Sequence, residues 1–194
     1  MKAEFEAKAF ARTLVGSKWI REETAARLSW SGARVLAVAL DQAALLGFPY
    51  VGAEHLMVAA LARPGLTGVV TVDVDAFCDA LLLSSSRFVQ PCPDQLAHAR
   101  ATRNAAPAAA RIPSPIPPMN YSAEARLHDA IALAGGAECG AGHIALAIAR
   151  APRGLPHVGA PSHRPYLELL ERELAPQSDW HDLASLVLEH GGAT

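Results

Sequence analysis

The chain has 194 residues, a formal net charge of −2 and a hydrophobic content of 51%, with an aromatic share of only 6%. Its length suits one domain or two small units packed together, and its core must be filled mainly by alanine, leucine and valine. The nearly neutral charge argues against a protein that binds the phosphate backbone of nucleic acids or an anionic membrane surface.

The cysteines and the N-terminal sequence indicate a compartment. Cys78, Cys92 and Cys139 are odd in number and form no C-x-x-C pair, which argues against a disulfide framework and fits a reducing environment. The N-terminus has acidic residues where a signal peptide needs an apolar run. The longest apolar stretch, residues 35–46, is too short to span a bilayer. We therefore expect a soluble, cytoplasmic protein.

Two helices are predicted in the leader, residues 1–27. Residues 2–14 place apolar side chains among charged ones at the spacing of an amphipathic helix, which Gly16 would end. Residues 19–28 predict a second helix. Two roles stay open for this leader: it packs on the domain, or it binds another molecule.

The next segment predicts three helices. The first is opened by Ser29 or Ser31 and carries its apolar face on residues 35–46. Glu54 stands at the start of the second, where its charge suits the positive end of the helix dipole. Residues 72–82 have the pattern of a third helix.

The composition changes between residues 84 and 118, where repeated prolines remove backbone donors and prevent long helices. A short helix is expected over residues 94–103, and the run at 112–118 predicts polyproline II. We interpret residues 84–118 as a semi-rigid linker, in preference to a ligand for an SH3-type domain.

Helical patterns return after residue 119. Ser122 is predicted as the N-cap of a helix that Gly135 ends. No alternating strand pattern of convincing length occurs in the chain, so the predicted fold class is all-α. The remaining helices are expected at residues 142–148, 166–174 and 180–190.

One short pattern occurs twice. Gly-Ala-Glu-His-Leu at residues 52–56 returns as Gly-Ala-Gly-His-Ile at residues 140–144. Each copy follows an alanine-rich helical pattern opened by serine, and each leads into a short apolar helix. A repeat of this length indicates one supersecondary unit used twice, with both copies sharing a core.

These two copies resemble the N-terminal domain of the Clp-type AAA-plus unfoldases, in particular the ClpC branch. The resemblance covers residues 28–82 and 119–175 and is stronger in the first copy, where Ala53 replaces a family threonine. It implies an all-α, pseudo-twofold bundle of two four-helix repeats with extra terminal helices. The implied segments are an extension at 1–27, repeat 1 at 28–83, a linker at 84–118, repeat 2 at 119–176 and a C-terminal helix at 177–194.

The resemblance also implies a function. Such domains bind substrate proteins, adaptors, arginine-phosphorylated clients and some cyclic peptide antibiotics. No string matches G-x-x-x-x-G-K-[ST], so the chain lacks a P-loop for nucleotide. We therefore expect a non-enzymatic binding module without cofactor, which modulates Clp protease function by capturing clients or adaptors, or by sequestering Clp-directed antibiotics.

Site residues follow from the same resemblance. Glu54 stands where the family glutamate receives a guanidinium, and Ser29 where a threonine helps to hold phosphate. In the second copy these positions are Gly142 and Ser122, so the carboxylate is lost. A first-turn acid that only stabilises its helix is an equally good reading of Glu54. The predicted ligand- or peptide-binding residues are Leu28, Ser29, Tyr50, Glu54, His55, Tyr121, Ser122 and His143, and the aromatic ones are also compatible with simple core packing.

The alternative function is a metal-dependent hydrolase that uses histidine or cysteine. His55 and His143 have no carboxylate at ligand spacing, so we expect them to stack or hydrogen-bond in their turns. Cys139 takes a position that is usually aliphatic in the family, which favours a buried apolar role over a nucleophile. The sequence predicts no metal site.

Overall fold

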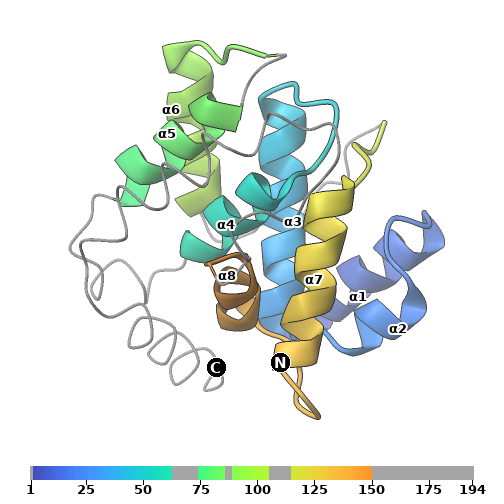
Figure 1. Cartoon of the computed structure of the whole chain (residues 1–194). Helices are drawn as coiled ribbons and strands as arrows, with labels where there is room; N and C mark the ends of the chain where they lie inside the picture. Colours follow the sequence, from blue (N-terminus) through green and yellow to red (C-terminus); the bar gives the residue numbers. More distant parts are fainter. Residues whose placement is uncertain (1, 63–73, 86–88, 105–114, 150–194) are drawn as a thin grey trace.

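The computed structural model describes residues 2–62, 74–85, 89–104 and 115–149 (Figure 1). Within these ranges the protein is all-α, as predicted, and the only β pairing consists of two isolated bridges. The helices are α1 (Lys2–Gly16), α2 (Glu22–Ala26), α3 (Trp30–Leu45), α4 (Ala53–Leu61), α5 (Val74–Ser85), α6 (Pro93–Asn104), α7 (Tyr121–Leu133) and α8 (Ala141–Ala149).

Helix α3 lies at the centre. Ser29 is its N-cap, and the Ser29 hydroxyl accepts a hydrogen bond from the Gly32 amide at 3.2 Å. Gly47 follows the helix with a φ of 74°, a left-handed conformation that glycine adopts without strain. Residues 31–40 are buried throughout, so α3 is covered on every side and not only along the expected apolar stripe.

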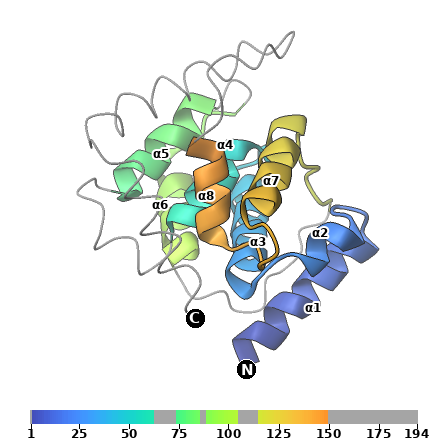
Figure 2. The same cartoon turned by 60° about the horizontal axis from the view of Figure 1, so that its bottom comes forward.

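The other helices pack around α3. Helices α4, α7 and α8 contact one another and form the rest of the centre. Helices α1 and α2 lie on one side of this group and α5 and α6 on the other (Figures 1 and 2). The shared core is made largely of alanine and leucine, as the composition predicted.

Helix α6 falls inside the segment predicted as a linker, at the position expected for a short helix. Gln42 of α3 donates through Nε2 to the Ala99 carbonyl and to the Thr102 hydroxyl, each at 3.1 Å. Ala99 is fully buried. Residues 93–104 of the predicted linker therefore pack on α3, while residues 86–88 and 105–114 lie outside the described ranges.

A buried arginine joins α6 to α5. The Arg103 side chain is fully buried and donates from Nη2 to Asp75 Oδ1 at 2.7 Å and from Nη1 to Asp79 Oδ1 at 3.2 Å. Arg100, which is exposed, also pairs with Asp79. A buried guanidinium requires such partners, since its charge is costly to remove from water.

The start of α7 differs from the prediction. Its N-cap is Asn120, whose side chain accepts from the Ala123 amide at 2.9 Å, and Ser122 lies inside the first turn. Asparagine and serine are comparable N-caps, so local preference does not decide between them. The predicted end is confirmed by Gly135, which has a φ of 59°.

The helices expected at residues 166–174 and 180–190 lie outside the described residues. Of the expected polyproline run, residues 115–118 are described and are non-helical. Residues 112–114 lie outside the described ranges. In the described ranges, no helix combines the length and the apolar character needed to cross a lipid bilayer.

Candidate binding site

The first bridge pairs Leu28, just before α3, with Cys139, just before α8. The Cys139 amide donates to the Arg27 carbonyl at 2.6 Å, and the Ser29 amide donates to the Cys139 carbonyl at 3.0 Å. This parallel pairing fixes the N-terminal ends of α3 and α8 against each other.

The second bridge pairs Val51, before α4, with Met119, before α7. The Val51 amide donates to the Pro118 carbonyl at 2.8 Å, and the Asn120 amide donates to the Val51 carbonyl at 2.9 Å. The pattern of donors and acceptors is the same as in the first bridge. Each bridge joins a helix from the first half of the chain to one from the second half.

The two Gly-x-x-His turns are also alike. The Gly52 amide donates to His55 Nδ1, and the Gly140 amide donates to His143 Nδ1, both at 3.1 Å. Each Nδ1 is therefore an acceptor, which leaves the ring proton on Nε2. His55 is buried, and the edge of its ring contacts Phe48 with ring centres 4.6 Å apart. Both histidines hold the start of a helix.

Ser29 and Glu54, which the resemblance placed in one pocket, lie beside different bridges. Ser29 follows the bridge between Leu28 and Cys139, whereas Glu54 follows the bridge between Val51 and Met119. The two bridges lie before different helices of the second half of the chain, α8 and α7. The bridge between Val51 and Met119 brings the start of α4, which carries Glu54, against the start of α7.

We define the Glu54 site as Tyr50, Glu54, Asn120 and Tyr121. Glu54 is only 8% exposed, and its Oε1 lies 3.3 Å from His55 Nδ1. Burial and the charge of Glu54 both raise the pKa of Tyr50, so these two side chains interact. Tyr121, in the first turn of α7, is 69% exposed.

The opposite end of α3 has another chemistry. The Ser29 and Ser31 hydroxyls share a hydrogen bond of 3.1 Å, and the Ala141 amide of α8 donates to Ser31 at 3.2 Å. Gly142 occupies the place equivalent to Glu54, and neither α3 nor α8 has an acid in its first turn. Ser122, from α7, is not part of this end.

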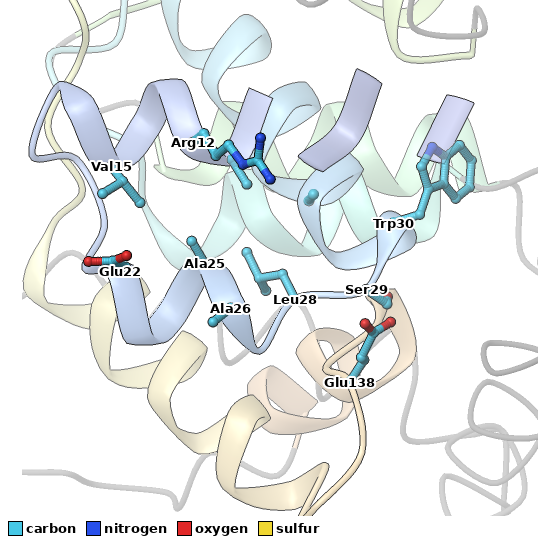
Figure 3. Close-up of a pocket in the computed structure, with 11 residues that line it drawn as sticks. Arg12, Val15, Glu22, Ala25, Ala26, Leu28, Ser29, Trp30 and Glu138 are labelled. Atoms are coloured by element: carbon cyan, nitrogen blue, oxygen red, sulfur yellow. The ribbon is translucent and has the colours of Figure 1, made fainter. Parts of the chain in front are cut away.

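A pocket of about 300 Å³ lies beside Ser29, between α1, α2 and the start of α3 (Figure 3). We call it the leader pocket, because α1 and α2 supply most of its wall. The sequence analysis identified Leu28 and Ser29 but missed the other lining residues, since nothing local shows that the leader packs here. The lining residues are Ala11, Arg12, Val15, Glu22, Ala25, Ala26, Leu28, Ser29, Trp30, Ala33 and Glu138.

The histidines and cysteines bear on the alternative of a metal-dependent hydrolase. These ranges contain no group of three or more His, Cys, Asp or Glu side chains that could hold a metal ion. Burial raises the pKa of the Cys139 thiol to about 12 in spite of the nearby Arg27 charge, which disfavours the thiolate that a nucleophile needs.

No protein-family model, curated protein or solved structure matches this chain.

Proposed function

We propose that the chain is a non-catalytic module that binds proteins or peptides and is related to the N-terminal domain of the ClpC-type unfoldases. In this proposal one helical unit occurs twice, once with α3 and α4 and once with α7 and α8. The observation that carries it is the reciprocal pair of bridges, which repeat the same hydrogen-bond pattern and are each followed by the same Gly-x-x-His cap.

The bridges supply the register of the proposed repeat. Leu28 takes the same place as Met119, and Val51 takes the same place as Cys139. Asn120, not Ser122, then corresponds to Ser29, since each caps its helix one residue after a bridge. In this register Ser122, which the resemblance made the equivalent of Ser29, stands two residues after the equivalent position.

The Glu54 site supports recognition of a guanidinium. A carboxylate that is mostly buried forms strong charge-assisted hydrogen bonds with a planar guanidinium. The first turn of α7 adds backbone amides at the positive end of a helix dipole, which suits a phosphate attached to that guanidinium. Tyr50 and Tyr121 add aromatic surface of the kind that anchors peptides.

The proposed ligands are clients or adaptors with arginine or phosphoarginine side chains, and Clp-directed cyclic peptides. Binding them without an ATPase would alter the supply of ligands to the Clp protease machinery, or would sequester the antibiotic. The proposed place of action is the cytoplasm. No specific observation favours the metal-dependent hydrolase.

Calorimetric titration tests the proposal with a phosphoarginine peptide and a Clp-directed cyclic peptide as probes. We expect Glu54→Gln to lower the affinity for the phosphoarginine peptide by about tenfold, because one charge-assisted contact is lost. Glu23→Gln is the matched control, since Glu23 is also a first-turn acid but is exposed on α2. Failure of both probes to bind the wild-type protein would overturn the proposal.

A further inference from the structure

The leader pocket has an apolar floor. Six of its lining residues are alanine, valine or leucine, drawn from α1, α2, the first turn of α3 and the segment between α2 and α3. Trp30, at the first position of α3, is half-buried and closes one end, while Val15 and Glu22 lie at the other (Figure 3). A volume of about 300 Å³ is at the lower limit of small-ligand pockets and suits one or two peptide residues.

Three charged side chains surround this floor. Arg12, Glu22 and Glu138 are all exposed, and none forms a side-chain hydrogen bond or ion pair within the part of the chain that the structure describes. Glu138 stands beside Ser29, and Arg12 extends between the two ends (Figure 3). Two carboxylates against one guanidinium give the rim an excess negative charge.

The hydroxyl closest to the pocket is already engaged. Ser29 Oγ accepts from the Gly32 amide and donates to the Cys139 carbonyl at 3.3 Å. A phosphate placed there would meet Glu138 without a free hydroxyl to bind it, so the rim disfavours an anion. Charge complementarity selects a cation instead.

We infer that the leader pocket binds a lysine or unphosphorylated arginine side chain of a peptide. The aliphatic stem lies on the apolar floor, as such stems do when only the charged head stays in water. The head pairs with Glu138 near the end that Trp30 closes, where the indole ring attracts cations, or with Glu22 at the other end. Arg12 donates to carbonyl groups of the peptide backbone.

This inference rests on the proposed function, because it takes the ligand to be a peptide. It adds a second site with the opposite preference to the Glu54 site: the leader pocket selects against a phosphate on the side chain. It also gives the leader a role in binding, in addition to its packing against α3.

The test titrates acetyl-Leu-Arg-Leu-amide, its Gln and Glu analogues and its phosphoarginine form into the full chain. We expect the Arg peptide to bind best among the first three and to weaken as salt rises, since the rim charges are exposed. Glu22→Gln and Glu138→Gln should each weaken it by about fivefold, and Glu23→Gln should leave it unchanged. Ala26→Leu should abolish binding, because the larger side chain fills the pocket. Ala26 is exposed, so the substitution does not disturb the buried core.

The outcomes separate the two proposals. Equal affinity for the Arg and Gln peptides, or no effect of the Glu22 and Glu138 variants, overturns the pocket inference alone, provided that phosphoarginine still binds through Glu54. If none of the peptides binds, the inference fails together with the peptide-binding function. Melting curves of each variant show whether a loss of binding reflects a loss of fold.

Discussion

Gly32 of α3 lies against the backbone of Cys139. A Cβ atom at position 32 would stand 2.2 Å from the Cys139 carbonyl oxygen, the same oxygen that accepts from the Ser29 amide. Only glycine permits this close approach, because it has no Cβ atom. The first bridge therefore requires glycine at position 32.

Gly32→Ala should therefore destabilise the protein. Alanine improves helix propensity by up to about 1 kcal/mol, but its clash with the Cys139 carbonyl costs about 1–3 kcal/mol. The clash also disrupts the bridge between Leu28 and Cys139. We expect a net loss in the free energy of unfolding, measured with urea. Gly136→Ala is the control, because a Cβ there meets nothing within 4 Å. Equal stability of the two variants would show that the bridge does not hold α8 in place.

His143 should make stability depend on pH. Burial lowers the pKa of His143 below its usual value of 6.5, so the unfolded chain binds the proton more readily than the folded one. The contribution of neutral His143 to the free energy of unfolding is then fully present above about pH 6.5. It is lost as the pH drops toward the lower pKa of the folded state.

His143→Asn removes this proton and keeps an acceptor for the Gly140 amide. Unfolding free energies measured from about pH 8 to pH 5 should fall less steeply for this variant than for the wild type. His128→Asn, at an exposed position, should follow the wild type. If the unfolding free energy of His143→Asn falls with pH as steeply as that of the wild type, groups other than His143 cause the pH dependence.

Arg103 should matter far more than its neighbour Arg100. Arg103→Ala leaves Asp75 and Asp79 without their buried cation and opens a cavity under α6, for an expected loss of about 3 kcal/mol. Arg100→Ala removes an exposed pair with Asp79 and should cost less than about 1 kcal/mol. Hydrogen exchange of α6 should accelerate in the first variant only. Similar losses in both would contradict the buried role of Arg103.

The three cysteines should differ in reactivity. Cys92 is exposed, whereas Cys78 and Cys139 are buried, and the pKa of Cys139 is raised to about 12. Brief treatment with a maleimide near neutral pH should label Cys92 alone, and all three should react after denaturation. Mass spectrometry of the labelled peptides gives the result. Fast native labelling of Cys139 would revive the nucleophile hypothesis.

Features set by a few neighbouring residues were predictable. The helix end at Gly135 and a serine cap at Ser29 or Ser31 follow from local chemistry, and the structure has Gly135 and Ser29 in these places. The α7 cap was misplaced because Asn120 and Ser122 are similar candidates. What selects Asn120 is remote: its amide donates to Val51, which holds the residue in the extended conformation of an N-cap.

The candidate site was less predictable for the same reason. Sequence order places Ser29 and Glu54 in one repeat, but the bridges pair the start of α3 with α8 and the start of α4 with α7. The leader pocket depends on α1 packing against α3, which brings Arg12 and Glu22 to Glu138. Such long-range contacts leave no spacing pattern within any single segment.

Chemical-shift mapping of the full chain with a phosphoarginine peptide tests the central claim most directly. We predict that the amides of Glu54, Tyr121 and Ser122 shift together, because α4 and α7 form one site across their bridge, while those of Ser29 and Trp30 stay in place. Shifts confined to Ser29, Trp30 and the start of α8, with Glu54 unaffected, would contradict it.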